Sequence, residues 1–227
     1  MTSFTNANLL YRATRDGFSA EAFHQKCDNY HNTLTIIKTN GNYVFGGFAS
    51  VLWNEVLVGW IDDPKAFLFS LRRNGIANDQ KFVVNNNTWH ADYTIEDNFR
   101  SGPSFGGGSD ISICSNSNVD AFSYSYFCIT FVCPDECITS SDSWSCGRSY
   151  LAGSFDGWLT SEIEVYQLSY TDYVELATTT NPATDFINDE RTIVNESMFS
   201  FTIIYLLIYL LCLKFFKNYQ NYKNLPF

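Results

Sequence analysis

Stretches rich in β-branched and aromatic residues, bounded by turn-forming residues, run along most of the chain and predict strands. Residues 33–39 (TLTIIKT) and 66–71 (AFLFSL) are the clearest examples, because such side chains favour the pleated conformation. Asn40-Gly41 follows the first stretch and suits the positive φ angles of a tight hairpin, so residues 33–39 and 43–50 are predicted to pair antiparallel. Further strands are predicted at residues 80–84, 88–93, 110–115, 122–127 and 162–168.

One amphipathic helix is predicted near the N-terminus. Ser19 precedes AEAFHQKC and can cap the first free amides of a helix, and Glu21 lies favourably at the positive end of the helix dipole. Phe18, Ala22 and Cys27 are expected to face a sheet. Because no strand–helix–strand alternation is visible, the pattern favours an α+β, mainly β fold or a layered sandwich over a doubly wound fold.

The sequence changes character after residue 170. Thr, Asn and acidic residues dominate up to residue 197, a composition typical of a linker. No charge occurs from Ser197 to Leu213, and a helix over this stretch would extend about 26 Å at about 1.5 Å per residue, near the lower limit for crossing a bilayer. We therefore predict a domain at 1–170, an acidic Thr/Asn-rich linker at 171–197, an apolar transmembrane helix at 198–216 and a short basic tail at 217–227.

Three interpretations of the apolar helix stay open. As a tail anchor it would insert after synthesis and leave a cytoplasmic domain tethered to the membrane by its C-terminus, since the N-terminal residues lack the apolar stretch of a secretory signal. Lys214, Lys217 and Lys223 lie beyond the helix and oppose this orientation by the positive-inside rule. The alternatives are a buried or interfacial helix and translation of a non-coding stretch.

Composition indicates one folded, aromatic-rich domain with an appendage. Hydrophobic residues make up 45% and charged residues 17% of the 227 positions, as in globular proteins. Because residues 198–227 contain three lysines and no acid, residues 1–197 hold 11 basic and 24 acidic groups, a net charge of −13. Nucleic-acid binding relies on clustered Lys and Arg, so this charge excludes a nucleic-acid partner.

Two glycine-rich stretches, YVFGG at 43–47 and FGGGSDISI at 105–113, raise the question of phosphate binding. A dinucleotide fingerprint would need glycine where Ile111 stands, and a phosphate loop would need Gly-Lys-Ser/Thr where Ser109 and Asp110 follow. An aspartate beside a phosphate has the wrong sign. We therefore predict that these glycines let another backbone or a bulky ring approach, or permit a bulge, and that the chain takes no cofactor.

Candidate catalytic groups are sparse. The three histidines have no spacing that predicts a metal pair or an activated nucleophile, and His24 is expected at the surface or half-buried. Glu162 and Glu164 alternate with aliphatic residues in SEIEVYQL, so on a strand both carboxylates point to one face. The usual meaning of this pattern is a solvated face, and the alternative is a shared acid–base role.

Four of the seven cysteines, Cys128, Cys133, Cys137 and Cys146, lie within nineteen residues. Four sulfurs suffice for a tetrahedral zinc site, but their spacing matches no zinc ribbon or finger, and no metal is predicted. Because no secretory signal is visible, reduced thiols in the cytosol are the default. Ordinary buried or loop thiols are expected, with a redox-sensitive pair as the alternative.

Four motifs follow one another in order along residues 9–168: Arg15-Asp16-Gly17-Phe18, Phe45-Gly46-Gly47, Phe105-Gly106-Gly107-Gly108 with Asp110, and Glu162-Ile163-Glu164-Val165. This series resembles the TLDc domain family. The resemblance implies a two-sheet antiparallel β-sandwich with a few peripheral helices, in which the glycines serve the architecture. It also implies a link to protection against oxidative damage and to binding and regulation of the vacuolar proton-pumping ATPase, with no reaction securely attached.

Two parts of the chain depart from the resemblance: the cysteine-bearing segment 126–150 and the apolar tail. The leading hypothesis is a non-catalytic TLDc-like interaction module that acts through its surface on a protein partner, with vacuolar ATPase subunits as the partner that the resemblance implies. The alternative is an enzyme of peroxide or small-molecule chemistry that uses Glu162 and Glu164, or a thiol of the cysteine cluster.

Overall fold

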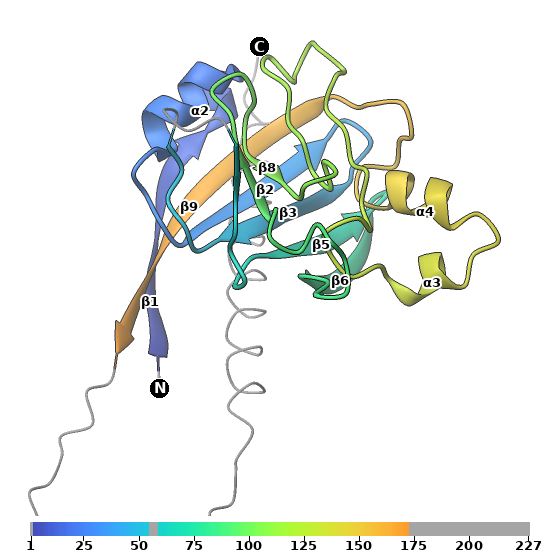
Figure 1. Ribbon diagram of the computed structural model, residues 1–227. Coiled ribbons are helices and arrows are strands. Elements are labelled where there is room, and N and C mark those ends of the chain that lie inside the picture. Colours follow the sequence, from blue (N-terminus) through green and yellow to red (C-terminus); the bar gives the residue numbers. More distant parts are fainter. Residues whose placement is uncertain (1, 55–58, 173–227) are drawn as a thin grey trace, which may run out of the picture. The chain divides into compact units, whose positions relative to one another are not determined.

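The computed structural model of the chain describes residues 2–54 and 59–172, which form antiparallel sheets of six and three strands with four short helices (Figure 1). The prediction of a mainly β fold with few helices is confirmed. The larger sheet, in spatial order, consists of β1 (Thr2–Arg12), β9 (Thr160–Asp172), β2 (Thr33–Thr39), β3 (Val44–Ala49), β5 (Phe67–Arg73) and β6 (Ile76–Val83). The smaller sheet consists of β4 (Gly59–Ile61), β7 (Ile95–Asp97) and β8 (Ser104–Phe105). The helices are α1 (Ala13–Asp16), α2 (Ala20–Cys27), α3 (Asp135–Ile138) and α4 (Ser143–Tyr150).

The layer opposite the large sheet is only in part a regular sheet. The strands predicted at 110–115 and 122–127 are replaced by isolated bridges, among them Ser112 with Tyr124. The strand predicted at 88–93 is wrong: successive turns occupy this stretch, with Ala91 N donating to Thr88 O and Tyr93 N to His90 O. β-propensity alone did not distinguish these segments from strands, because pairing depends on partners far away in the sequence.

The predicted hairpin is present, and β2 pairs antiparallel with β3 so that Ile36 lies opposite Gly46. Its turn differs from the prediction, because the positive φ angle of 62° falls on Asn42 and not on Gly41. Asn42 N donates to Thr39 O at 3.2 Å, and Thr39 N donates to Tyr43 O at 3.0 Å. This is the longer hairpin connection, in which a turn is followed by one left-handed residue.

The predicted N-terminal helix corresponds to α2. Ser19 caps it by accepting a hydrogen bond from Ala22 N at 3.1 Å. Cys27 is fully buried, as is Phe23, which the prediction had not placed on the inner face. His24 was expected near the surface but is buried: its Nδ1 lies 2.9 Å from Asp28 Oδ1, and its Nε2 faces backbone carbonyls of a neighbouring loop.

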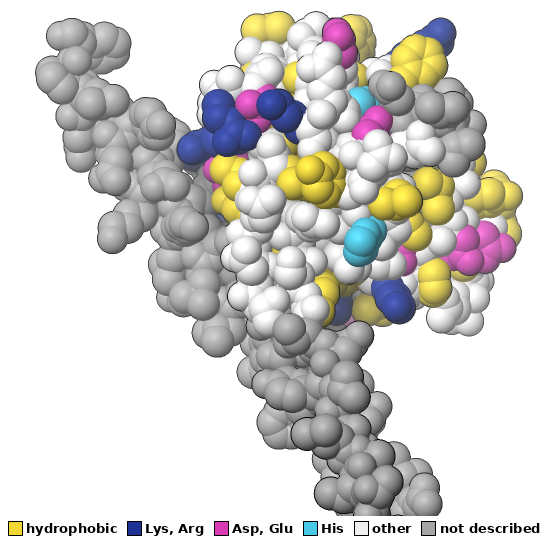
Figure 2. Space-filling model, turned by 90° about the vertical axis from the view of Figure 1, so that its left-hand side faces the viewer, with side chains coloured by type: hydrophobic (Ala, Val, Ile, Leu, Met, Phe, Trp, Pro, Cys, Tyr) yellow, Lys and Arg dark blue, Asp and Glu magenta, His cyan; other side chains and the backbone are white. Residues whose placement is uncertain are grey.

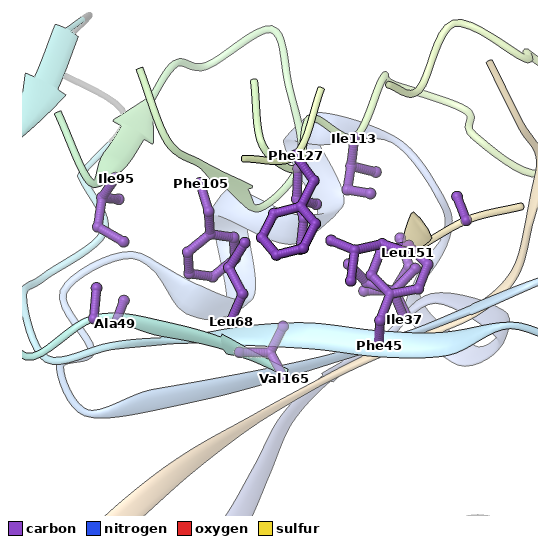
Figure 3. Close-up of a cluster of buried hydrophobic side chains, with 14 of the residues drawn as sticks. Ile37, Phe45, Ala49, Leu68, Ile95, Phe105, Ile113, Phe127, Leu151 and Val165 are labelled. Atoms are coloured by element: carbon purple, nitrogen blue, oxygen red, sulfur yellow. The ribbon is translucent and has the colours of Figure 1, made fainter. Parts of the chain in front are cut away.

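The core lies between the large sheet and the opposite layer (Figure 3). From the large sheet it takes Ile37, Phe45, Ala49, Leu68 and Val165, and from the segments facing it Ile95, Phe105, Ile113, Phe127 and Leu151. Burying aliphatic and aromatic side chains of this size stabilises a fold by about 1.5–3 kcal/mol each. Both sets of side chains exclude water from the space between the layers.

The C-terminal predictions concern residues that the structure leaves largely undescribed. β9 extends to Asp172, so the first two residues of the expected linker belong to a strand. The remainder of that linker, the apolar helix at 198–216 and the tail at 217–227 lie outside the described residues. Within residues 2–54 and 59–172, no helix has the length and apolar character needed to cross a membrane.

Candidate functional site

The first glycine-rich stretch lies on β3, where it brings neighbouring groups close. A Cβ at residue 47 would lie 2.7 Å from the ring of Phe105 on β8. A Cβ at residue 46 would collide with the carbonyl oxygen of Thr35 and lie 2.8 Å from the ring of Phe69. These two glycines therefore admit aromatic rings on both faces of the strand.

The second stretch, Phe105–Gly108, encloses an anion that belongs to the chain itself. Gly106 has a φ angle of 84°, and a Cβ there would collide with the Asp110 carboxylate. That carboxylate is buried and accepts hydrogen bonds from Ile129 N and Thr130 N, each at 3.0 Å. Burial raises the pKa of Asp110 to about 6. The backbone amides of residues 129 and 130 are thus directed at Asp110, and this carboxylate fastens the glycine loop to the segment that carries the cysteines.

The Arg15-Asp16-Gly17-Phe18 motif covers the end of α1 and the start of the connection from α1 to α2. The Arg15 guanidinium holds the pKa of Asp16 below its ordinary value, and the Asp16 carboxylate also accepts a hydrogen bond from Arg12 N at 2.9 Å. Gly17 has a φ angle of 105°, and its carbonyl accepts a hydrogen bond from the buried Tyr11 hydroxyl at 2.7 Å. Phe18 packs against the core. The motif orders the entry to α2.

Glu162 and Glu164 share one side of β9, but this side is buried and not solvated. Their residues are only 7% and 1% exposed, so the solvated face expected from the sequence is wrong. Arg12 Nε lies 3.2 Å from Glu162 and 3.3 Å from Glu164, and Thr14 N donates to Glu162 at 3.0 Å. β1, which lies beside β9 in the sheet, supplies Arg12, and α1 supplies Thr14. Burial raises the pKa of Glu164, but the two carboxylates bind the fold together and are not open to a substrate.

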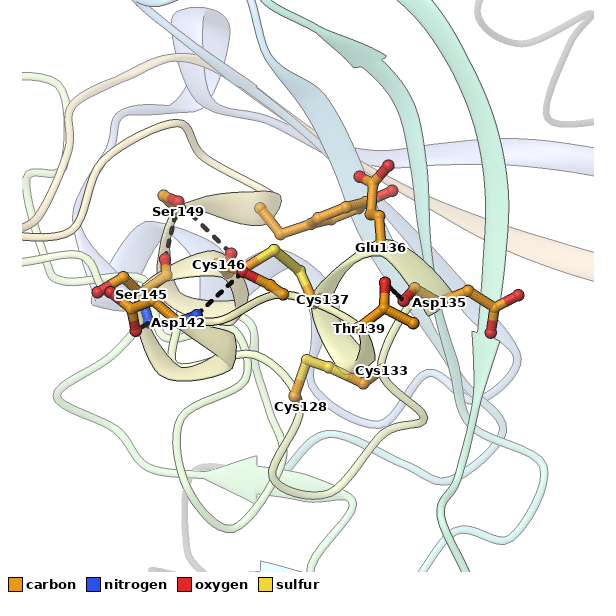
Figure 4. Close-up of a disulfide and its surroundings, with 12 residues drawn as sticks. Cys128, Cys133, Asp135, Glu136, Cys137, Thr139, Asp142, Ser145, Cys146 and Ser149 are labelled. Carbon is orange, nitrogen blue, oxygen red and sulfur yellow. Dashed lines mark hydrogen bonds between the residues drawn. A yellow bond between two sulfur atoms is a disulfide. The ribbon is translucent and has the colours of Figure 1, made fainter.

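The four clustered cysteines form two disulfides, Cys128–Cys133 and Cys137–Cys146 (Figure 4). The expectation of ordinary thiols is therefore wrong for them. The paired Cα atoms are 4.6 and 5.4 Å apart, within the usual range for a disulfide, and this proximity depends on turns that the cysteine spacing does not reveal. Cys137–Cys146 joins α3 to α4, and Asp142 caps α4 by accepting a hydrogen bond from Ser145 N.

The remaining thiols of the described residues are two free cysteines, and neither belongs to a metal site. There, Cys27 and Cys114 are free thiols, the first buried and the second half-buried. Burial raises the pKa of both thiols, which disfavours the reactive thiolate. No three His, Cys, Asp or Glu side chains of residues 2–54 and 59–172 lie where they could hold one metal ion.

Exposed aromatic side chains form two surface groups that the sequence analysis missed. One consists of Trp60, Trp89 and Tyr93, exposed by 41%, 79% and 37%. In the other, Trp144 and Arg148 of α4 lie together, with the guanidinium 4.9 Å from the Trp144 ring centroid. The polar surroundings of Trp89 in NNNTWHADY were a usable signal, since a tryptophan amid polar residues has few apolar neighbours in sequence to be buried with. Figure 2 shows one face of the molecule, on which hydrophobic side chains form separate patches between polar ones.

The described residues thus make up a mainly β domain whose charged motifs are used by the fold itself. A family model for the TLDc domain matches residues 2–169, and the chain belongs to the TLDc domain family. This confirms the resemblance seen in the sequence. No curated protein matches the chain significantly.

Proposed function

We propose that this chain is a non-catalytic interaction module that acts through its surface on a protein partner. The observation that carries the proposal is the burial of Glu162 and Glu164, which are held by Arg12 and Thr14. A general acid or base has to reach the proton that it transfers, and carboxylates only 7% and 1% exposed do not. Exposed tryptophans, by contrast, are typical of the residues that dominate protein interfaces.

We propose two settings for this interaction, which membership of the TLDc family supports: regulation of the vacuolar proton-pumping ATPase and protection against oxidative damage. The first is tested by immobilising the folded full-length chain and passing cell lysate over it, with detection of the pump subunits by mass spectrometry. Enrichment of pump subunits over a resin that carries an unrelated acidic protein is expected. Recovery of none would contradict the pump as partner.

A cytoplasmic domain tethered by residues 198–216 is a further part of this proposal. It rests on the uncharged stretch from Ser197 to Leu213, which is near the length needed to cross a bilayer. Carbonate extraction of membranes that contain the native protein provides the test. The tether predicts that the chain stays in the membrane pellet, and release into the supernatant would contradict it.

The enzymatic alternative is favoured by one observation, the two disulfides of the segment 128–146. Disulfides in cytosolic proteins are usually transient, catalytic or redox-sensing. Purified chain supplied with hydrogen peroxide and a dithiol distinguishes the two functions. An interaction module leaves the rate of peroxide loss at that of the dithiol alone. An enzyme reduces many equivalents of peroxide to water for each chain, with oxidation of one dithiol to a disulfide per peroxide, and loses this activity when the four cysteines are replaced by serine.

A further inference from the structure

The exposed residues Trp60, Trp89 and Tyr93, together with Glu96, form what we call the aromatic surface. The ring centroids of Trp60 and Tyr93 are 6.2 Å apart, and those of Trp89 and Tyr93 are 6.5 Å apart, both with edge-to-face geometry. The three rings therefore form one connected group and not three isolated exposures. Tryptophan and tyrosine supply large contact areas at protein interfaces at a low cost in conformational entropy.

Strand pairing places a carboxylate beside this group. Trp60 on β4 lies directly opposite Glu96 on β7, and directly opposed residues of an antiparallel pair carry their side chains on the same face. Trp60 is 41% exposed, while Glu96 is half-buried. The carboxylate thus lies next to an open indole ring at the surface of the small sheet.

The rest of the aromatic surface is held in place by the glycine loop. A Cβ at Gly107 would lie 2.6 Å from Tyr93 Cβ and 2.9 Å from His90 Nδ1. The His90 ring in turn contacts the Trp89 ring, with 3.4 Å between the centroids and the two planes tilted by 32°. The missing side chain of Gly107 therefore lets the turn that bears Trp89 and Tyr93 settle against the loop. This gives Gly107, the second of the motif's three glycines, a role at the surface.

Glu96 brings a carboxylate to the aromatic surface. Glu96 makes no ion pair within the part of the chain that the structure describes, and burial raises its pKa because the charged form is partly desolvated. Asp62 and Asp92, close to the rings in sequence, are exposed. A cation placed over an indole face and beside a carboxylate gains from both contacts.

We propose that the aromatic surface binds a basic segment of a partner protein, with a Lys or Arg side chain on the Trp60 ring beside the Glu96 carboxylate. The net charge of −13 on residues 1–197 favours the approach of such a segment. The proposal rests on the function as an interaction module, but it does not require that the partner be the proton pump.

Three fluorescein-labelled peptides of equal length test this proposal against the full-length chain by fluorescence polarisation. They carry four Lys, four Arg or four Glu residues between Gly-Ser spacers. The Lys and Arg peptides are expected to bind and the Glu peptide to show no saturation. Trp60→Ala and Glu96→Gln should each weaken binding of the basic peptides at least fivefold, and added salt should weaken it further.

Matched controls separate a specific surface from general attraction by net charge. Trp144→Ala removes another exposed tryptophan, and Glu21→Gln removes an exposed glutamate. Both should bind as the wild type does. Basic peptides that bind all five proteins equally would overturn the proposal, as would equal binding of the Glu peptide. Urea unfolding midpoints within error of the wild type show that Trp60→Ala and Glu96→Gln are folded.

Two further outcomes have defined meanings. In the first, phosphatidylcholine vesicles bind the wild type but not Trp60→Ala, and the basic peptides do not bind. This result would overturn the proposal in favour of a lipid surface. In the second, no pump subunits are captured, but the basic peptides bind and Trp60→Ala abolishes this binding. This result would leave the proposal intact and remove only the pump as partner.

Discussion

The ring of Phe105 occupies the space that a side chain at Gly47 would fill. A Cβ at residue 47 would lie 2.7 Å from this ring, and Phe105 packs edge-on against Trp53 with 5.8 Å between the ring centroids. The phenylalanine of the second glycine motif therefore lies on a glycine of the first. This contact joins β3 of the large sheet to β8 of the small one.

Gly47→Ala is expected to lower the free energy of unfolding by about 1–3 kcal/mol, the usual cost of overpacking a filled core. Gly59→Ala provides the control, because a Cβ there meets nothing within 4 Å and its backbone has no positive φ. That variant should stay within about 0.5 kcal/mol of the wild type. Urea unfolding measures both, and equal midpoints for the two variants would contradict the packing role.

Asp110 should make stability fall as pH rises. Its pKa is raised from 3.8 to about 6, so the folded chain keeps a proton that the unfolded chain has lost. Its contribution to stability is complete below about pH 4 and is lost as pH rises through about 6. The two-unit shift corresponds to about 3 kcal/mol. The measurement is the free energy of unfolding of the wild type and of Asp110→Asn at each pH. The difference, wild type minus variant, should decrease between pH 4 and pH 7.

Asp142→Asn is the control for this titration. The Asp142 carboxylate is exposed at the start of α4, and hydrogen bonds from Ser145 hold its pKa below the ordinary value. The corresponding difference for this variant should be flat between pH 4 and pH 7 and change only at lower pH. If this difference has the same pH dependence for Asp110→Asn as for Asp142→Asn, then ionisation of Asp110 does not destabilise the fold, and the prediction is wrong.

Glu162→Ala should lower the free energy of unfolding by about 2–3 kcal/mol, since it removes hydrogen bonds to a charged acceptor and leaves Thr14 N without its buried partner. Glu136→Ala breaks the exposed pair with Arg73, and this change should cost about 0.5 kcal/mol or less. Both variants delete a glutamate, so the comparison isolates burial. A similar loss for the two would contradict the anchoring role of Glu162.

Replacement of Cys137 and Cys146 by serine should lower the free energy of unfolding by about 2–3 kcal/mol, because their bond closes a short loop in the unfolded chain. Addition of a dithiol should have a comparable effect on the wild type. Cys114→Ser, which removes a free thiol, should keep the wild-type response to the dithiol. Insensitivity of the wild type to reduction would show that the disulfides do not stabilise the fold.

Local signals along the chain were sufficient for the elements that depend on neighbours in sequence. Ser19 and the apolar positions after it define α2, and the β-branched run from Thr33 identifies β2. The positive φ angles of the following turn were assigned to Asn40-Gly41, whereas the left-handed residue is Asn42, because several hairpin connections fit the same four residues.

Features that depend on distant segments could not be predicted from the pattern. The alternation of Glu162 and Glu164 gives a shared face, but only the position of β1 decides that this face is buried. The two disulfides depend on the turns around α3 and α4. The aromatic surface needs the register of β4 with β7 and the contact of Gly107 with Tyr93, neither of which leaves a periodic signal.

The central claim is that this domain acts by binding and that its buried carboxylates serve only the fold. The most direct measurement is the survival of peroxide-treated cells that express equal amounts of folded wild type, the Glu162→Gln/Glu164→Gln double variant or the Trp60→Ala/Glu96→Gln double variant. The account predicts that the Glu162→Gln/Glu164→Gln variant protects as well as the wild type and that the Trp60→Ala/Glu96→Gln variant does not protect. Loss of protection by the Glu162→Gln/Glu164→Gln variant, with full protection by the Trp60→Ala/Glu96→Gln variant, would contradict the account.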